Sequence, residues 1–156
     1  MGKEHTYALT VRWTGDTGEG TAGYRAYSRS HDVIAEGKPT LRGSADPAFF
    51  GDAACWSPED LLLAALSQCH MLTFLSLCAR AGIVVVGYED RATGTMRELP
   101  GYSGQFTEVV LSPTVTVATG EMVAEAEPLH REANRTCFIA NSVNFPVRHR
   151  PITRSR

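Results

Sequence analysis

The stretch SPEDLLLAALSQCHMLTFLSLCARAG, residues 57–82, decides the fold. Ser57 is suited to cap a helix and Pro58 to occupy its first position. Asp60 stands where a side chain can return the hydrogen bond of the cap. A helix is therefore predicted from Pro58 to about Ala81, ended by the glycine that follows. Its interior carries no formal charge with histidine neutral, which is typical of a central helix that protein buries nearly all round.

A helix this apolar could also span a membrane. The polar residues in its middle are uncomfortable in lipid, and no asymmetry of Lys and Arg in the flanking loops supports a span, so we expect no membrane contact. These polar residues are Ser67, Gln68, Cys69, His70, Thr73 and Ser76. The helix would be about 36 Å long, as long as a domain of this size is wide. Its apolar surface is therefore expected to need cover from a second chain, in an extensive homodimer.

Composition limits the classes of function. The 156 residues, 43% of them hydrophobic, are expected to form one globular domain over residues 1–156. The 15 basic and 17 acidic residues are interspersed, so no patch for nucleic acid is expected. The first residues lack the features of a secretory signal, and a cytoplasmic location is expected. In such a chain four cysteines are packing residues or reactive thiols rather than a disulfide framework.

The rest of the chain alternates apolar runs with turn residues. A second helix is predicted from after Gly120 towards Arg135, with a break at Pro128, and a short helix at 138–143. Residues 43–56 are expected to form a long surface loop. Strands are predicted at 7–13, 24–28, 31–35, 84–96, 106–117 and 147–153. Because strands and helices are segregated along the chain, the predicted fold class is α+β.

The cysteines differ in their prospects for chemistry. Cys69 lies in the middle of the long helix, and Cys78 follows nine residues later, about 180° around it, so the two cannot share a site. A buried cysteine is by default a small, inert apolar residue, and Cys55 is interpreted as incidental. Cys137 follows a polar segment whose basic groups could favour its thiolate, or it is a half-buried thiol at a helix end.

A metal site built from Cys69, His70, His130 and Cys137 is a weaker alternative. Adjacent helical residues such as Cys69 and His70 point about 100° apart and do not converge easily on one ion. The sequence also lacks the usual hydrolase, nucleotide-binding and metalloprotease motifs. Any chemistry is therefore expected to be that of sulfur, without a metal or another cofactor.

The sequence resembles the OsmC and organic hydroperoxide resistance superfamily over nearly its whole length. The resemblance rests on Pro58-Glu59 opening the central helix, on Cys69 ten residues after Glu59, and on the distal Cys137. The segments 20–29 and 133–147 are most similar to the general OsmC-like branch.

This resemblance implies an OsmC-like fold in which antiparallel sheets pack around a long central helix, in an intertwined homodimer with two active sites at its interface. It implies a thiol peroxidase that reduces organic hydroperoxides to alcohols. Cys69 would be the peroxidatic cysteine, Cys137 the resolving one, and an Arg and a Glu would activate the thiolate. An external dithiol, either a small molecule or a lipoylated protein, would reset the enzyme.

Two departures from the family pattern are visible. Better-characterised branches have Cys-Pro at the second cysteine, where this chain has Cys137-Phe138. The activating Arg of the family lies in the early turn, where this chain offers no arginine. We expect Arg25 or Arg29 to take the place of this activating Arg. The two would lie on one face of a strand if side chains alternate with a period of two, and each could equally be a solvated surface charge.

Glu59 has two interpretations. It could orient the activating guanidinium through a bidentate pair, or it could complement the helix dipole as an ordinary first-turn acid. Ten helical residues separate Glu59 from Cys69 by about 15 Å along one straight helix. Direct participation at Cys69 is therefore expected to come from Glu59 of the partner chain.

Other functions fit the same cysteine pair. The chain could be a non-enzymatic thiol redox sensor, or a thiol–disulfide exchange or small-molecule binding protein on the same fold. The apolar residues near the cysteines could take up the hydrocarbon part of a hydroperoxide or could simply be core. These residues are Leu66, Met71, Leu72, Phe74 and Phe138.

Overall fold

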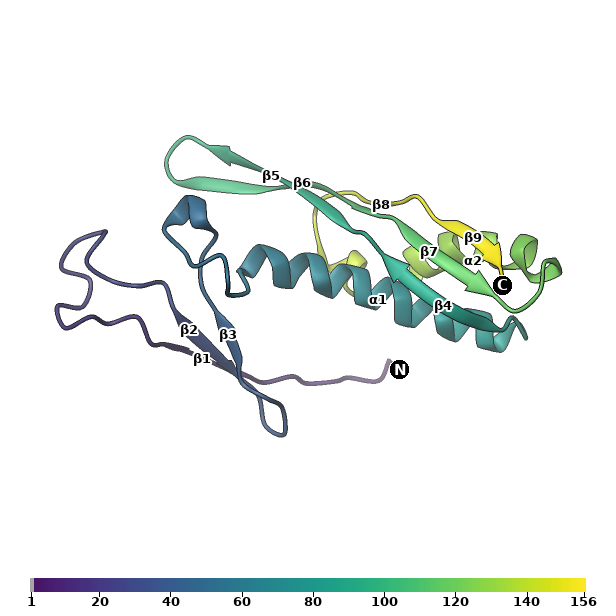
Figure 1. Cartoon of the computed structure of the whole chain (residues 1–156), viewed down its shortest axis with the longest axis horizontal. Coiled ribbons are helices and arrows are strands. Elements are labelled where there is room, and N and C mark those ends of the chain that lie inside the picture. Colours follow the sequence, from purple (N-terminus) through teal and green to yellow (C-terminus); the bar gives the residue numbers. More distant parts are fainter. Residues whose placement is uncertain (1) are drawn as a thin grey trace. The chain divides into compact units, whose positions relative to one another are not determined.

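The structure is a computed structural model that describes residues 2–156. It confirms the α+β class, with two α-helices and several small sheets (Figure 1). The chain divides into two compact units, Met1–Leu61 and Leu62–Arg156. Such a division does not by itself decide the expected single domain, which stays a prediction.

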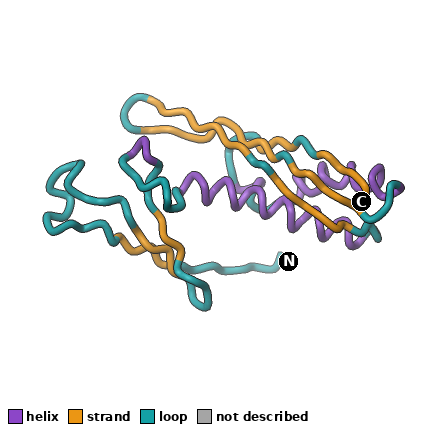
Figure 2. The backbone as a smooth tube through the Cα atoms, in the orientation of Figure 1, coloured by secondary structure: helices purple, strands orange, loops and turns teal. Residues whose placement is uncertain are grey.

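The first unit contains one small antiparallel sheet. Its strands β1 (Thr10–Trp13), β2 (His31–Ile34) and β3 (Leu41–Gly43) pair in chain order. Loops make up much of this unit, apart from the short 3-10 helix η1 (Pro47–Phe49), as Figure 2 shows. The predicted strand at 31–35 is therefore confirmed, whereas β3 was missed.

The strand predicted at 24–28 is wrong. That segment consists of turns and bends. The carboxylate of Asp16 accepts the backbone N–H groups of Gly18 and Gly20, at 2.8 and 2.9 Å, and both glycines have a positive φ. These bonds fold the chain into a wide loop instead of a tight hairpin, because an aspartate side chain competes well for local backbone donors. β1 consequently pairs with β2 beyond the loop.

Helix α1 (Pro58–Arg80) begins where the sequence predicts and ends one residue before the expected Ala81. The Ser57 hydroxyl accepts the N–H of Asp60 at 3.1 Å, and the Asp60 carboxylate accepts the N–H of Ser57 at 3.1 Å. This reciprocal pair is a capping box. Beyond the helix, Gly82 has φ +75° and Ile83 N–H reaches back to the Cys78 carbonyl, as in a glycine C-cap.

The second unit holds two three-stranded sheets, ordered β4-β7-β9 and β5-β6-β8. In each, the first pair is antiparallel and the second is parallel, so the expectation of purely antiparallel sheets is corrected. The strands are β4 (Val85–Asp90), β5 (Thr93–Leu99), β6 (Ser103–Leu111), β7 (Pro113–Val117), β8 (Val147–His149) and β9 (Ile152–Ser155).

The predicted long strands are each divided in two. The divisions of 84–96 and 106–117 lie opposite one another, where Pro113 pairs with Asp90. Proline has no N–H for a ladder bond, and the Asp90 carboxylate takes the N–H of Ser112 at 2.6 Å. The two strands therefore change sheet at the same point, which periodicity alone could not show.

Helix α2 (Glu121–Thr136) runs through Pro128 without the expected break. Pro128 and Ala124, whose carbonyl the proline leaves without a donor, are both exposed, so water can satisfy that carbonyl. The predicted short helix at 138–143 is the 3-10 helix η2 (Ala140–Ser142).

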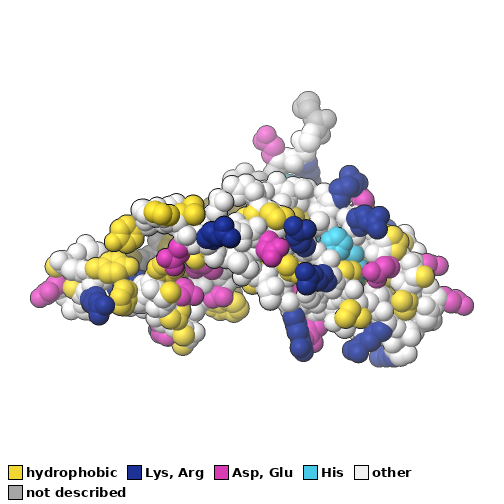
Figure 3. Space-filling model, turned by 90° about the horizontal axis from the view of Figure 1, so that it is seen from above, with side chains coloured by type: hydrophobic (Ala, Val, Ile, Leu, Met, Phe, Trp, Pro, Cys, Tyr) yellow, Lys and Arg dark blue, Asp and Glu magenta, His cyan; other side chains and the backbone are white. Residues whose placement is uncertain are grey.

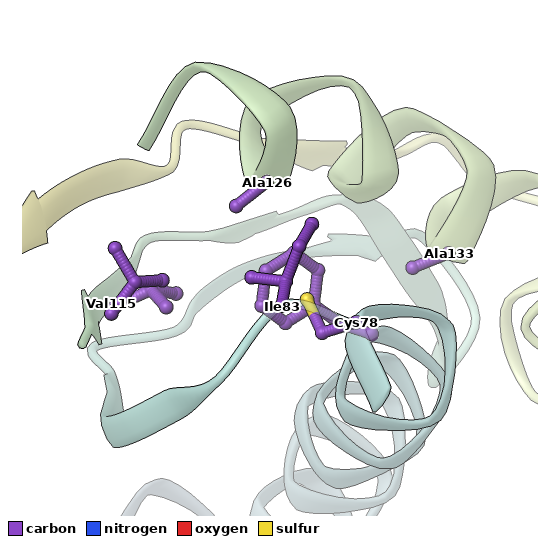
Figure 4. Close-up of a cluster of buried hydrophobic side chains, with 7 residues drawn as sticks. Cys78, Ile83, Val115, Ala126 and Ala133 are labelled. Carbon is purple, nitrogen blue, oxygen red and sulfur yellow. The ribbon is translucent and has the colours of Figure 1, made fainter. Parts of the chain in front are cut away.

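Two clusters of buried side chains form the core of the second unit. The larger one joins α1, β7 and α2, and Figure 4 shows Cys78, Val115, Ala126 and Ala133 directed towards a common centre. Its members are Phe74, Cys78, Ile83, Val115, Val117, Ala126 and Ala133. The smaller one consists of Leu66, Val109 and Leu111. These clusters fix the position of α1 against the strands and α2.

Within this one chain α1 is buried along a single stripe, made of Leu66, His70, Phe74 and Cys78. These residues recur every four positions and so lie on one face of the helix. Leu72, on another side, is 60% exposed. The expectation of burial all round is thus wrong for the single chain. By length and composition alone the helix could cross a membrane, a test that core helices of soluble proteins also pass.

The surface carries charges of both signs. Lys and Arg side chains are interspersed with Asp and Glu on the face shown in Figure 3. The ion pairs found among residues 2–156 are Arg91–Glu89, Arg135–Glu132 and Arg148–Glu108, and all are largely exposed. Exposed pairs contribute little to stability, so the buried clusters carry the fold.

The cap of α1 yields a stability prediction. Ser57→Ala removes the hydroxyl that accepts the Asp60 N–H, and it should lower the free energy of unfolding by about 1 kcal/mol, measured by urea denaturation. Ser76→Ala, an exposed position in the same helix, is the matched control and should change stability little. Equal losses in both variants would contradict the role of the cap.

Candidate functional site

Two cysteines from different helices meet in the second unit. Cys69 lies in the middle of α1, and Cys137 is the residue that caps the C-terminus of α2. The Sγ atom of Cys137 lies 2.7 Å from Sγ of Cys69, and both are free thiols. A disulfide requires about 2.05 Å between the sulfurs, so little further approach is needed. The predicted pair is therefore brought together.

The two thiols differ in accessibility. Cys137 is 1% exposed, whereas Cys69 is half-buried. Burial, together with the hydrogen bond to Cys69, raises the pKa of the Cys137 thiol to about 11, against a smaller opposing effect of the Ala140 N–H. Cys137 is thus held as a protonated thiol beside a more accessible Cys69. The replacement of Cys-Pro by Cys137-Phe138 has not kept the two sulfurs apart.

The other two cysteines have different surroundings. Cys78 is 1% exposed within the larger core cluster, and burial raises its pKa to about 11. Such a thiol is unreactive, as expected for a small core residue. Cys55 belongs to the first unit. The prediction that Cys69 and Cys78 do not share a site is confirmed.

Arg25 and Arg29 lie in the first unit, in turns rather than on one strand face, so that part of their predicted placement is wrong. The Arg29 guanidinium donates to the carbonyls of Tyr27 and Tyr24, at 2.7 and 2.6 Å, and stacks on both rings. The Arg25 guanidinium lies 4.7 Å from the Phe50 ring centre. Cation–π contacts hold both guanidinium groups while leaving them charged.

Glu59 stands in the first turn of α1, and its Oε2 atom is buried without a hydrogen-bond partner among the residues that the structure describes. A buried carboxylate oxygen without a partner is costly, and a cation is its natural complement. The uninterrupted helix places Glu59 ten residues before Cys69, about 15 Å along its axis. The role of Glu59 from a partner chain at Cys69 stays a prediction.

A stack of histidines lies beside the cysteine pair, and the sequence did not predict it. His70 Nε2 is 3.1 Å from His130 Nδ1, and the two rings are nearly parallel. The ring centre of His149 of β8 lies 5.9 Å from that of His70, and the Phe74 ring stacks on His130 with 3.9 Å between ring centres. His70 and His130 are 1% and 0% exposed. The only sequence signal was that each falls on an apolar helical stripe.

Burial shifts the titration of these histidines. It lowers the pKa of His70 to about 4 and that of His130 to about 3, and the neighbouring histidines add to both effects. The pKa of His149 is also lowered, chiefly by burial. All three rings are therefore uncharged at neutral pH.

The alternative of a metal site can be compared with this geometry. Among residues 2–156 no three His, Cys, Asp or Glu side chains are arranged so that they could hold a metal ion. His70 Nε2 and His130 Nδ1 face each other at 3.1 Å, so these two nitrogens bond one another instead of facing a common ion. The described geometry thus offers no ligand set made of these two histidines and the two cysteines.

A groove of about 470 Å³ is lined by residues of α1 and of the end of α2, some of which are close in sequence to the cysteines. Thr73, whose hydroxyl bonds the Cys69 carbonyl, lines it, as do Thr136 and Phe138 on either side of Cys137. Leu72 and Phe138 offer exposed apolar surface there, whereas Leu66 and Phe74 are fully buried core residues. The groove is lined by Leu72, Thr73, Ser76, Leu77, Arg80, Glu132, Thr136 and Phe138.

Comparison with known proteins identifies the family. The sequence model of the OsmC-like protein family matches residues 51–150. The chain belongs to the OsmC-like protein family. A solved OsmC-like protein of unknown function from Vibrio cholerae O1 biovar eltor is 32% identical to it, with a TM-score of 0.86 over 96% of this chain and 100% of the other.

More distant OsmC-like structures share the fold. An organic hydroperoxide resistance protein from Elizabethkingia anophelis, solved with thiocyanate bound, is 16% identical, with a TM-score of 0.68 over 99% of this chain and 100% of the other. One from Legionella pneumophila is 17% identical, with a TM-score of 0.67 over 96% and 98%. The search of curated proteins gave no significant match. The predicted family is confirmed, and several relatives are named for hydroperoxide resistance.

The histidine stack predicts a dependence of stability on pH. The folded-state pKa values of His70 and His130 lie below the ordinary value of 6.5, so the unfolded chain takes up protons first as the pH falls. The free energy of unfolding should therefore be highest above pH 6.5 and should decline towards pH 4. Between pH 7 and 5 the loss should be about 2 kcal/mol for each histidine, measured by urea denaturation.

The matched control is the double variant His70→Gln, His130→Asn, which keeps polar atoms near the bonded positions but cannot titrate. Its stability should change far less between pH 7 and 5. An equally steep decline in this variant would show that other groups cause the acid sensitivity.

Proposed function

We propose that this chain is a cysteine-based thiol peroxidase that reduces organic hydroperoxides to alcohols. The observation that carries the proposal is the 2.7 Å approach of the Cys137 and Cys69 sulfurs across two helices. Two free thiols this close can form a disulfide without rearrangement of the backbone. Membership of a family that includes hydroperoxide resistance proteins adds support.

Cys69 is the attacking residue because it is the more accessible of the two. Its thiolate attacks the outer oxygen of the hydroperoxide, the O–O bond breaks, and the alkoxide leaves as the alcohol with one proton. Cys69 is oxidised to a sulfenic acid, and the peroxide is reduced by two electrons.

Cys137 resolves this intermediate. Its buried, protonated thiol lies in contact with Cys69, so the sulfur attacks the sulfenic sulfur, and the hydroxyl group leaves as water with the thiol proton. The Ala140 N–H, 3.4 Å from the Cys137 sulfur, stabilises negative charge as the proton departs. The product is a Cys69–Cys137 disulfide, which protects Cys69 from further oxidation.

The cycle closes by thiol–disulfide exchange. An external dithiol, either a small molecule or a lipoyl group on a protein, reduces the disulfide and is itself oxidised. No bound cofactor takes part in this scheme. The proposal places the enzyme in the cytoplasm, where dithiol reductants are maintained, without a nucleic-acid or membrane partner.

The groove beside the cysteines favours organic substrates. Exposed side chains of Leu72 and Phe138 can cover hydrocarbon surface next to Cys69, with a gain of about 25 cal/mol for each Å² removed from water. Hydrogen peroxide offers no such surface. Cumene hydroperoxide should therefore have a higher kcat/KM than hydrogen peroxide, and the reverse order would count against this assignment of the groove.

The activating groups complete the proposal. A thiolate at Cys69 needs a cation, which Arg25 or Arg29 supplies, and Glu59 of a second chain orients the guanidinium. The unpartnered Oε2 of Glu59 and the exposed apolar side of α1 both support an intertwined homodimer. In that assembly the second copy covers the helix surface that one chain leaves open.

Turnover of cumene hydroperoxide with excess dihydrolipoamide tests the central proposal. Wild type should complete many turnovers, and Cys69→Ser should lose at least about a thousandfold in kcat/KM because no nucleophile remains. Cys137→Ser should react once and then stall as a sulfenic acid. Cys55→Ser is the control and should behave as wild type, whereas absence of turnover in wild type with every dithiol would refute the peroxidase.

Glu59→Gln tests the activation step. If Glu59 orients the guanidinium, its loss should weaken the stabilisation of the Cys69 thiolate and slow alkylation by iodoacetamide about tenfold at pH 7. Glu121→Gln removes the equivalent first-turn acid of α2 and should leave alkylation unchanged. Equal rates for Glu59→Gln and wild type would leave Glu59 as a helix-dipole residue only.

Two other functions use the same pair. A redox sensor would form the disulfide with hydroperoxide but would not turn over with any dithiol. A thiol–disulfide exchange protein would reduce a model disulfide in the absence of peroxide. The groove lined by Thr136 and Phe138, on either side of Cys137 in the sequence, favours the peroxidase over both, since it provides a place for a small organic substrate.

A further inference from the structure

The histidine pair is a directional contact between the two helices that carry the cysteines. Among residues 2–156, the His70–His130 contact is the one side-chain hydrogen bond that joins α1 to α2 themselves. The other side chains that these helices contribute to the larger cluster are apolar. Apolar contacts tolerate sliding, whereas a hydrogen bond at 3.1 Å specifies position and rotation.

The histidines are placed where such a contact controls the sulfurs. His70 directly follows Cys69 in α1, and His130 precedes Cys137 by seven residues, which is about two turns. Positions seven apart lie on the same face of a helix, so His130 and Cys137 both face α1. A small slide or rotation of α2 would therefore move the Cys137 sulfur relative to Cys69.

This contact is costly as a stabilising device. His70 Nδ1 and His130 Nε2 are buried and have no hydrogen-bond partner among the described residues. Unsatisfied buried nitrogens destabilise a core, and apolar side chains of similar shape would pack there at lower cost. Stability therefore does not account for two histidines at this position, whereas the need for a fixed helix register does.

We propose that His70 and His130 are positioning residues that hold Cys137 in register with Cys69 for disulfide formation. The inference rests on the proposed function, because it assigns these histidines to the resolving step of that reaction. Neither touches the reacting atoms, and both act through the relative placement of α1 and α2.

The surroundings keep this pair uncharged. His149 of β8 lies against the pair and favours the neutral form of His70, Asp90 of β4 opposes this with a smaller effect, and the Tyr88 hydroxyl lies buried near Phe74. Arg131 and Glu127 of α2 act on His149 rather than on the pair. If two of these neighbouring histidines were protonated, their positive charges would repel each other. The hydrogen bond therefore forms between neutral rings.

The test compares three substitutions at position 130. In His130→Asn the amide occupies the place of the bonded Nδ1 atom, in His130→Gln it lies one carbon further out, and His130→Phe keeps the ring but removes the bond. Each full-length variant is equilibrated at pH 7 with mixtures of reduced and oxidised dithiothreitol. Alkylation and peptide mass spectrometry then give the fraction of Cys69–Cys137 disulfide.

We expect His130→Asn to stay within threefold of wild type in its equilibrium constant with dithiothreitol. His130→Gln and His130→Phe should each form the disulfide at least tenfold less favourably, a change of about 30 mV. Leu111→Val, a packing change in the other core cluster, is the control that lowers stability without moving the potential. Circular dichroism verifies that each variant is folded.

Two results would overturn the proposal. If His130→Gln and His130→Phe keep an equilibrium constant with dithiothreitol within twofold of wild type, the histidine pair does not position the cysteines. If the equilibrium constant falls as far in His130→Asn as in His130→Phe, ring packing and not the hydrogen bond positions the cysteines. Should the Phe variant not fold, the comparison of Asn with Gln decides the matter alone.

A second arm separates this inference from the peroxidase itself. After one equivalent of cumene hydroperoxide, His130→Gln should accumulate more Cys69 sulfenic acid than wild type, trapped by dimedone, because resolution is slowed. Absence of sulfenic acid in Cys137→Ser would count against the proposed function. The dithiothreitol equilibrium, which uses no peroxide, would still test the positioning role.

Discussion

The packing of α1 against α2 is the constraint on which the rest of the second unit depends. One stripe of α1, from Leu66 to Cys78, is buried, and the buried residues of α2 are Ala126, His130 and Ala133. That contact places the C-terminal end of α2 beside α1, and Cys137 is the residue at this end. The meeting of the two sulfurs is therefore a consequence of helix packing, and no local motif around either cysteine could produce it.

The site combines two environments that oppose one another. Burial keeps Cys137 protonated and keeps the histidine stack neutral, whereas a peroxidase needs negative charge on Cys69. Cys69 is only half-buried, whereas Cys137 and the histidines lie in the core, so the two demands fall on different residues. The unpartnered Glu59 oxygen and the open side of α1 are the two features on which the proposed homodimer rests.

The sequence was informative where interactions are local. The Ser57–Asp60 capping box and the glycine end of α1 depend on neighbours in the chain, and both were predicted. The strand expected at 24–28 failed because the Asp16 side chain takes two backbone donors, a competition that strand periodicity ignores. The histidine cluster unites α1, α2 and β8, and the sequence suggested His70 and His130 only as candidate metal ligands. Cys69 and Cys137 were paired by family resemblance, and no spacing rule links them.

A single-turnover reaction tests the central claim most directly. The reduced protein is treated with one equivalent of cumene hydroperoxide without any reductant, and the alcohol and the protein are both analysed by mass spectrometry. The account predicts one alcohol for each chain, the loss of two hydrogen atoms from the protein, and a peptide cross-link between Cys69 and Cys137. Unchanged thiols with unconsumed hydroperoxide, or a cross-link that involves Cys55 or Cys78 instead, would contradict it.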